Sequence, residues 1–451
     1  MKSKIKKAAI LSYSLFIISS SFFLSSCSVS KRISRQADHL LLNDPAISQG
    51  HIGISIFDPS TGKYVYNHNA DKYFIPASNT KLFSWYAGMK YLGDSLVAAR
   101  ITEFDKKLFI AGAGDPTTLH PSFKNQPLYE FLSKSTKTIW GVQKQFKAAP
   151  LGMGWAWDDY NASYMNERSE FPVFGNVVVF SGQKESVRYF PSAPVSFPAN
   201  KIYSNNGGKG FIDEVLRDRM SNSFTLYINA NEKKNVVVPF ITSTALAFKI
   251  LEDTLHKRIV SPEQVVPEQG LHEKVSQYVI RSQPADSLFQ PMMHNSDNFF
   301  AEQTLLMASN EFLGYMSDRD MIDTILKTSL KDIPHYPKWV DGSGLSRYNL
   351  FTPQDFVWLL NKTKNEFSWE RIKNTLPTGG EGTLSSYYKT EAGFIYAKTG
   401  TLSNNCALSG YLITKKNKML IFSVLVNNYP GGATAVRRAV EKFIKQLRER
   451  Y

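Results

Sequence analysis

A serine and a lysine lie three residues apart where an apolar, helix-forming run begins. Ser78 and Lys81 open this run, which continues to Leu92. Residues three apart on a helix share one face, about 5–6 Å apart at Cβ, so the lysine can act as a base towards the serine hydroxyl. The helix N-terminus would stabilise negative charge nearby. Ser-x-x-Lys also occurs elsewhere in the chain, but only Ser78 opens an apolar helix.

Two later motifs could assist such a nucleophile. Ser296 and Asn298 form a Ser-x-Asn sequence, a pattern that recurs in the chain and is weak alone. Lys398, Thr399 and Gly400 form the one Lys-Thr-Gly sequence, at the end of a strand-like run. On an edge strand, the lysine offers charge to a carboxylate, the threonine offers a hydrogen bond, and the glycine lets a substrate backbone approach closely. The order of the three motifs is more informative than any one of them.

Strands from both ends of the chain are predicted to build the sheet that positions these motifs. Residues 53–57 and 64–67 are strand-like and are joined by a turn that contains Pro and Gly, a hairpin signal. Residues 395–397, 408–413 and 419–427 indicate three further strands, and an amphipathic helix closes the chain. We therefore expect one antiparallel sheet of two N-terminal and three C-terminal strands.

The middle of the chain, roughly residues 98–258, has a different character. It is rich in Gly, Asn, Tyr and Val and contains strand-like pieces at residues 176–180 and 224–228. These features predict a mainly β insertion between the first and second motifs.

The composition excludes several classes of protein. With 43% hydrophobic and 13% aromatic residues among 451, the chain can bury a real core, which excludes a disordered or fibrous protein. The formal charge is +14, but no long Lys/Arg block or nucleic-acid motif accompanies it, so we expect no nucleic-acid partner. The two cysteines, Cys27 and Cys406, are too few for a disulfide framework or a multi-cysteine metal site. Neither a metal nor a cofactor is expected.

The first residues predict export. A lysine-rich segment at residues 2–7 precedes a mostly apolar segment at residues 8–24, which is too short and too rich in serine for a spanning helix. The Leu-Ser-Ser-Cys sequence that ends at Cys27 resembles the lipobox of bacterial lipoproteins, in which the cysteine is lipidated. We expect a signal peptide at residues 1–26 and a lipid on Cys27. An ordinary signal peptide or an uncleaved anchor are the alternatives.

The order Ser-x-x-Lys, Ser-x-Asn, Lys-Thr-Gly in an exported chain resembles the active-site set of penicillin-binding proteins and serine β-lactamases. Further phrases narrow the resemblance to the D-alanyl-D-alanine carboxypeptidase/endopeptidase family of low-molecular-mass penicillin-binding proteins, the class C or S13 peptidases. The phrases are PASNTKL (76–82), GAGDPT (112–117), GWAWDD (154–159), SDN (296–298), DGSGLSR (341–347), GEGTL (380–384) and AKTGTL (397–402).

The resemblance implies an α+β fold. A penicillin-binding-protein or serine-β-lactamase-like domain, with a five-stranded antiparallel sheet flanked by helices, would consist of residues 27–97 and 259–451. Residues 98–258 would form the inserted, mainly β domain. The number of residues between Ser78 and Ser296 agrees with an inserted domain, because β-lactamases have far fewer residues between their corresponding motifs.

The resemblance also implies roles for the residues of the first two motifs. Ser78 would attack the carbonyl of a D-Ala-D-Ala or related peptide bond, and Lys81 would act as its base. Such a base needs a lowered pKa, which burial and the nearby cation Lys398 could provide. Ser296 would relay a proton to the leaving amine, and Asn298 would hold a substrate amide.

The third motif would bind the substrate. Lys398 and Thr399 would hold its terminal carboxylate, or that of penicillin. Gly400 would let the substrate backbone approach. The backbone N–H groups of Thr401 and Ser78 would form the oxyanion hole.

The implied function is a penicillin-sensitive serine D-alanyl-D-alanine carboxypeptidase or DD-endopeptidase. It would act on peptidoglycan stem peptides, be acylated by β-lactam antibiotics, and be held by its lipid on the periplasmic side of a bacterial membrane. A serine β-lactamase-like hydrolase is one alternative, although the chain has no Glu-x-x-Leu-Asn loop of the kind that class A β-lactamases use for deacylation. A non-catalytic, cell-wall-binding lipoprotein of the same fold is the other.

Overall fold

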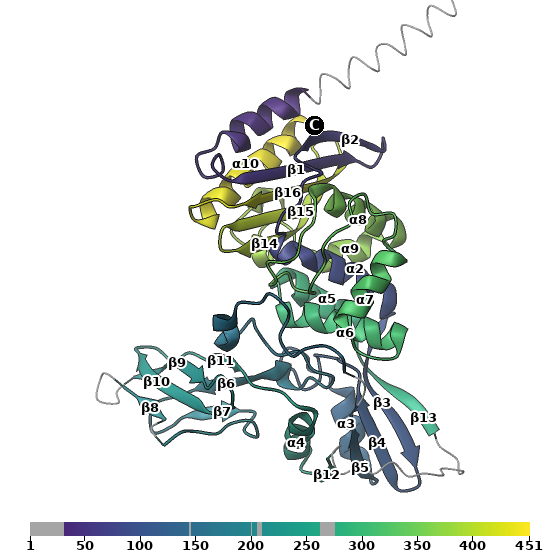
Figure 1. Cartoon of the computed structure of the whole chain (residues 1–451), viewed down its shortest axis with the longest axis vertical. Helices are drawn as coiled ribbons and strands as arrows, with labels where there is room; N and C mark the ends of the chain where they lie inside the picture. Colours follow the sequence, from purple (N-terminus) through teal and green to yellow (C-terminus); the bar gives the residue numbers. More distant parts are fainter. Residues whose placement is uncertain (1–30, 144–145, 200, 205–209, 262–275) are drawn as a thin grey trace, which may run out of the picture.

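The computed structural model of the chain describes residues 31–143, 146–199, 201–204, 210–261 and 276–451. The molecule is elongated, with both ends of the described chain in one region and further β-rich regions at the opposite end (Figure 1). The predicted signal peptide and Cys27 lie outside the described residues. Among the residues that are described, no helix is long and apolar enough to cross a membrane.

Strands from both ends of the chain form one antiparallel sheet, as predicted. β15 (Asn405–Ile413) and β16 (Met419–Asn427) are buried almost throughout, because helices cover both faces of the sheet, and their sequences are correspondingly apolar. β14 (Ile395–Leu402) is an edge strand, so one side of its backbone has no strand partner. The strand order is β14 (Ile395–Leu402), β15 (Asn405–Ile413), β16 (Met419–Asn427), β1 (His51–Asp58) and β2 (Lys63–His68).

α10 (Ala433–Arg450) covers one face of this sheet. Its buried side chains lie at helical spacing, because an amphipathic helix turns one apolar stripe towards a sheet. The first described residues pack into the same apolar cluster through Ile33, Ala37 and Leu41. The two ends of the described chain therefore lie side by side (Figure 1). The buried stripe of α10 includes Val436, Val440, Phe443 and Leu447.

Helices also cover the opposite face, and α2 (Lys81–Tyr91) lies among them. α2 is buried on nearly every side, which is why its sequence is apolar all round rather than striped. The short helix η2 (Ala77–Thr80) precedes it and lies beside β14. The other helices of this layer are α5 (Ala285–His294), α6 (Asn298–Leu313), α7 (Asp318–Lys327), α8 (Pro353–Glu366) and α9 (Trp369–Thr375).

A second sheet begins directly after α2. Its β13 (Ser276–Pro284) pairs antiparallel with β3 (Ser95–Phe104). The inserted region therefore extends from Ser95 to Pro284, beyond the boundaries expected at residues 98 and 258, because β13 completes the sheet that β3 begins. The strand order is β12 (Ile259–Val260), β5 (Thr138–Val142), β4 (Lys107–Gly112), β3 and β13. Helices α3 (Pro127–Lys134) and α4 (Thr244–Leu255) contribute to the same apolar core.

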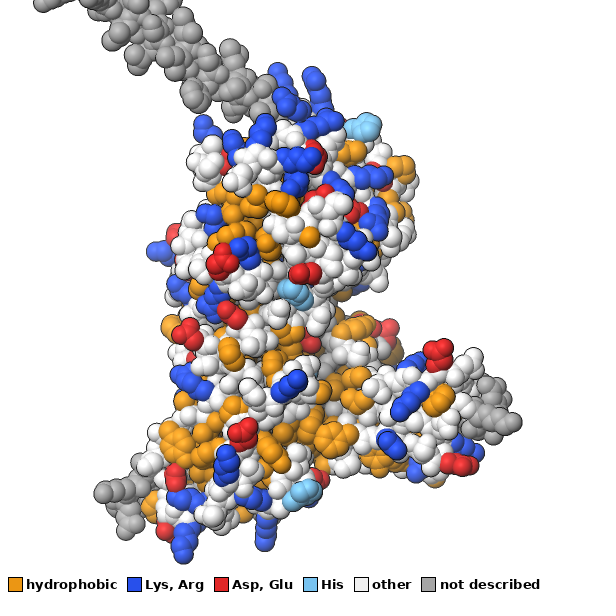
Figure 2. All heavy atoms as spheres, turned by 180° about the vertical axis from the view of Figure 1, so that it is seen from behind, with side chains coloured by type: hydrophobic (Ala, Val, Ile, Leu, Met, Phe, Trp, Pro, Cys, Tyr) orange, Lys and Arg blue, Asp and Glu red, His pale blue; other side chains and the backbone are white. Residues whose placement is uncertain are grey.

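Two three-stranded sheets form the lobe at the lower left of Figure 1. Strands are present at both places where the sequence predicted them, as β6 (Val177–Ser181) and β10 (Phe224–Ala230). Figure 2 shows hydrophobic side chains at the surface of the inserted region. The sheets are β11 (Val236–Pro239), β6 (Val177–Ser181) and β7 (Arg188–Phe190), and β8 (Ile202–Tyr203), β10 (Phe224–Ala230) and β9 (Phe211–Arg217).

Candidate active site

Lys81 and Ser78 lie together at the junction of η2 and α2, as their spacing predicts. The buried Lys81 Nζ donates a hydrogen bond to Ser78 Oγ at 3.0 Å. It also donates to Asn298 Oδ1 at 2.6 Å and to the Ser343 carbonyl at 2.8 Å. The three acceptors come from separate parts of the chain, and together they hold the amine against the serine hydroxyl.

Close backbone packing fixes the turn that carries Ser78. A Cβ at Gly344 would lie 1.9 Å from the Ala77 carbonyl oxygen, and one at Gly400 would lie 2.6 Å from the Pro76 carbonyl oxygen. Gly344 also has a φ of +84°. Only glycine therefore lets the 344 turn and β14 approach the nucleophile from two sides.

Lys398 and Ser296 form a second lysine–serine pair. Lys398 Nζ donates to Ser296 Oγ at 2.9 Å and to the Thr399 carbonyl at 2.8 Å. Ser296 has a φ of 59°, which turns the chain sharply before α6 begins. Asp297 caps that helix by accepting from the Phe300 N–H at 2.9 Å. The second and third motifs therefore meet directly across the site.

Asn298 connects the site to the inserted region. Its Oδ1 accepts from Lys81, while its Nδ2 donates to the Tyr164 carbonyl at 3.1 Å. A pocket of about 280 Å³ lies beside the second motif, between it and the inserted region, and His120 and Asn166 are among its lining residues. Ser296 and Asn298 also line it, so the pocket adjoins the second motif itself.

The two lysines share a water-excluded environment. Burial lowers the pKa of Lys81 from 10.5 to about 8, although the carboxylates of Asp297, Asp341 and Glu302 oppose the shift. Burial and the charge of Lys81 hold the pKa of Lys398 well below its ordinary value. Of the two causes that the sequence suggested, burial and the charge of Lys398, burial is the one that lowers the pKa of Lys81. A substantial fraction of Lys81 is therefore uncharged near neutral pH.

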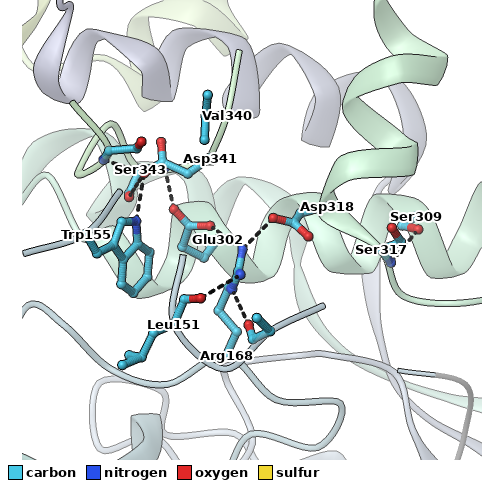
Figure 3. A network of polar contacts seen from close by, with 12 residues as sticks. Leu151, Trp155, Arg168, Glu302, Ser309, Ser317, Asp318, Val340, Asp341 and Ser343 are labelled. Carbon is cyan, nitrogen blue, oxygen red and sulfur yellow. Dashed lines mark hydrogen bonds and ion pairs between the residues drawn. The ribbon is translucent and has the colours of Figure 1, made fainter. Parts of the chain in front are cut away.

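A buried network behind Lys81 was not predicted from the sequence. Glu302 accepts from the Ser343 N–H at 2.7 Å, which fixes the backbone of the residue whose carbonyl receives the Lys81 hydrogen bond. Arg168, from the inserted region, donates to Glu302 at 3.3 Å and to Asp318 at 2.5 Å (Figure 3). Neither Arg168 nor Glu302 lies in one of the sequence motifs that indicated the family, so no local sequence pattern pointed to their role.

Asp341 organises the turn that contains Ser343. One of its carboxylate oxygens accepts from the Gly344 N–H at 2.9 Å, and the other accepts from the Ser346 N–H at 2.7 Å. Trp155 Nε1 donates to the same carboxylate at 2.9 Å (Figure 3). The GWAWDD and DGSGLSR phrases, far apart in sequence, are therefore in direct contact. In the described ranges, no cluster of three or more metal-binding side chains is present.

A serine beside a buried lysine, a Ser-x-Asn turn and a Lys-Thr-Gly edge strand, arranged on one five-stranded antiparallel sheet, define a serine enzyme of the penicillin-binding-protein class. The sequence pattern of the D-Ala-D-Ala carboxypeptidase 3 (S13) family matches residues 34–451, and the chain belongs to this family. It is a serine-type D-Ala-D-Ala carboxypeptidase. The α+β fold and the S13 resemblance expected from the sequence are confirmed.

Known proteins of this kind resemble the chain along most of its length. A D-alanyl-D-alanine carboxypeptidase of Actinomadura sp. is 26% identical over 89% of this chain and 82% of its own. The D-alanyl-D-alanine carboxypeptidase DacB of Haemophilus influenzae is 22% identical over 85% and 86%. The crystal structure of penicillin binding protein 4 (dacB) from H. influenzae superposes with a TM-score of 0.68 at 18% identity, covering 92% of this chain and 98% of that one.

Proposed function

We propose that the chain cleaves D-Ala-D-Ala or related D-centre peptide bonds of peptidoglycan stem peptides through an acyl-enzyme on Ser78. The observation that carries the proposal is the 3.0 Å contact between Ser78 Oγ and a buried lysine with a pKa of about 8. A lysine of ordinary pKa would hold its proton at neutral pH and could not act as a base.

Acylation follows from the positions of four side chains. Uncharged Lys81 takes the proton of Ser78 Oγ, and the oxygen attacks the substrate carbonyl to form a tetrahedral oxyanion. The N–H groups of Ser78 and Thr401 stabilise that oxyanion. The C–N bond then breaks as the proton held by Lys81 passes through Ser296, beside Lys398, to the leaving amine, which leaves Lys81 uncharged again. Water afterwards attacks the ester and gives a proton to Lys81, which returns it to Ser78 Oγ as the ester C–O bond breaks and the free acid is released.

The substrate is held between the second and third motifs. Asn298 binds an amide of the acyl part, and β14 binds the rest through Thr399, Gly400 and Thr401. Because β14 is an edge strand, its free backbone groups can pair with an extended peptide. A terminal D-Ala and a D-centre cross-link need the same acylation chemistry, so this site is compatible with carboxypeptidase and with DD-endopeptidase action. β-Lactam antibiotics acylate the same serine.

Labelling with fluorescent penicillin tests this proposal. The purified full chain in detergent is incubated beside Ser78→Ala, and the labelled peptide is identified by mass spectrometry. We expect a stable adduct on Ser78 that the variant lacks. A folded protein without an adduct would indicate a non-catalytic binding protein, and an adduct that disappears within seconds would indicate a β-lactamase.

We also propose that Cys27 carries a lipid that holds the enzyme on the periplasmic side of a bacterial membrane. Two features support the lipid anchor. One is the order of a lysine-rich segment, an apolar segment and then Cys27, and the other is the positive charge of the residues that follow. Lys31, Arg32 and Arg35 are exposed at the start of the described chain, where they would face anionic lipid headgroups. Cys27→Ala should lose membrane association after cell fractionation and keep penicillin labelling. A variant that stays in the membrane fraction would contradict the lipid anchor.

A further inference from the structure

The pocket between the start of α6 and the inserted region combines an apolar lining with a few polar groups. Its volume is about 280 Å³. Among the described residues, no lysine or arginine lines it, and the acidic lining residue Asp297 already accepts from the Phe300 N–H as the cap of α6. A pocket of this composition favours an uncharged ligand group with polar atoms at fixed places. The apolar lining residues are Val177, Val237, Phe299 and Phe300.

His120 offers this pocket a hydrogen-bond donor. Its Nδ1 accepts from the Ser122 N–H at 3.2 Å, and burial lowers the pKa of His120 to about 4. The ring is therefore uncharged at neutral pH and holds its proton on Nε2. That N–H has no hydrogen-bond partner among the described residues. It lies at the pocket wall, because a Cβ at Gly175, another lining residue, would be 3.3 Å from Nε2.

Asn166 offers the same pocket an acceptor. Only 9% of this residue is exposed. Its Nδ2 donates to the Gly175 carbonyl at 2.7 Å, which fixes the plane of the side-chain amide. Its Oδ1 has no hydrogen-bond partner in the part of the chain that the structure describes. One free donor and one free acceptor on the lining of a single pocket match the C=O and the N–H of an amide.

Ser296 places this pocket on the leaving side of the scissile bond. In the proposed mechanism Ser296 passes the proton to the leaving amine, and it lines the pocket together with Asn295. The leaving part of the substrate is therefore the part that adjoins the pocket. A terminal D-Ala has only a methyl side chain and offers no amide. The leaving D-centre of a cross-link does, because its side chain continues into the second stem peptide.

We propose that His120 and Asn166 form a subsite for an amide on the side chain of the leaving D-centre, so that cross-linked stem peptides are the favoured substrates. This inference rests on the proposed function and names the substrate class of the same site. The amide oxygen accepts from His120 Nε2, and the amide N–H donates to Asn166 Oδ1. The apolar lining excludes water from both hydrogen bonds and strengthens them.

Two matched peptides test the subsite on the purified full chain in detergent. Both have an N-acetyl-D-alanyl acyl part. The leaving residue is Nε-acetyl-D-lysine in one and D-α-aminononanoic acid, with an alkyl side chain of the same length, in the other. Release of the leaving amino acid is measured by chromatography. We expect the wild type to prefer the amide by about tenfold in kcat/KM, because the alkyl chain leaves the donor and the acceptor unpaired.

Three variants assign the preference to the two side chains. His120→Phe keeps an aromatic ring against Phe300, which the histidine ring contacts at 5.2 Å between centroids, but removes the donor. It should reduce the preference to within about threefold, and Asn166→Leu should do the same. His120→Gln retains a side-chain N–H and should recover part of the preference. Penicillin acylation by His120→Phe should stay within about twofold of the wild-type rate, because penicillin has no such side chain.

The readout is a ratio of two substrates on one variant, so a partly unfolded sample does not imitate the effect. A His120→Phe enzyme that keeps the wild-type preference, or that slows both peptides and penicillin alike, would overturn the inference alone. So would a variant that changes only the discrimination between two acyl parts with the same leaving residue. A wild type that cleaves neither peptide and takes no penicillin label would overturn the proposed function as well.

Discussion

Lys81 is completely buried, and burial lowers its pKa from 10.5 to about 8. At pH 7 about a tenth of such a group is uncharged, which is enough for it to act as a base. The ammonium form donates one hydrogen bond to each of three acceptors, Ser78, Asn298 and the Ser343 carbonyl, whereas the uncharged amine has two donors for Asn298 and Ser343 and a lone pair that can accept the Ser78 proton. At the scale of the residue, the local environment rather than the residue type makes the reaction possible.

The pH dependence of acylation tests this environment. The uncharged form of Lys81 is the reactive one, so the penicillin acylation rate should rise about tenfold per pH unit below the pKa of about 8 and level off above it. Rates measured by fluorescence from pH 6 to pH 10 give this profile. Lys81→Arg, whose guanidinium does not deprotonate, should be at least about 100-fold slower at every pH. A flat wild-type profile would exclude Lys81 as the titrating base.

At the scale of elements, the nucleophile is positioned by backbone contacts from two directions. The turn at Gly344 packs on the Ala77 carbonyl, and β14 packs on the Pro76 carbonyl through Gly400. Asn79 adds a hydrogen bond from its side chain to the Lys398 carbonyl at 2.9 Å. The position of Ser78 therefore depends on Gly344 and Gly400, where the methyl group of an alanine would not fit.

Gly344→Ala tests this packing, with Gly314→Ala as its matched control. Both glycines have nearly the same positive φ, +84° and +82°, but nothing lies within 4 Å of a Cβ at Gly314. Backbone strain of about 1–3 kcal/mol is common to both, whereas only Gly344→Ala displaces the turn before Ser78. We expect its penicillin acylation rate to fall about 100-fold and that of Gly314→Ala to change less than about twofold. Equal rates in the two variants would show that the contact does not position the serine.

At the scale of the whole molecule, the inserted region helps to hold the catalytic residues in place. Arg168 bridges Glu302 on α6 and Asp318 on α7, and all three side chains are largely buried. Glu302 in turn orients the Ser343 turn. The insertion is therefore part of the support of the active site and not an independent appendage.

Arg168→Met should destabilise the molecule, because it leaves Glu302 and Asp318 without their shared cation. Loss of one member of a buried ion pair typically costs about 3–5 kcal/mol. Urea unfolding followed by tryptophan fluorescence should show a lower midpoint, and penicillin acylation should slow because the Ser343 turn loses its support. The exposed Arg188→Met is the control and should change stability by less than about 0.5 kcal/mol. Indistinguishable unfolding curves for the two variants would contradict the bridging role.

The sequence by itself determined the features that depend on local spacing. Ser78 and Lys81 are three residues apart on one helical turn, both ends of the chain contain strand-like segments, and the sequence motifs identify the S13 family. Only the tertiary structure decided that β13 extends the insertion to Pro284 and that Arg168 supports the catalytic turn. These contacts join residues far apart in the chain. Local sequence periodicity describes which face of an element is buried but not which distant side chain will meet it, because that depends on how all the elements pack together.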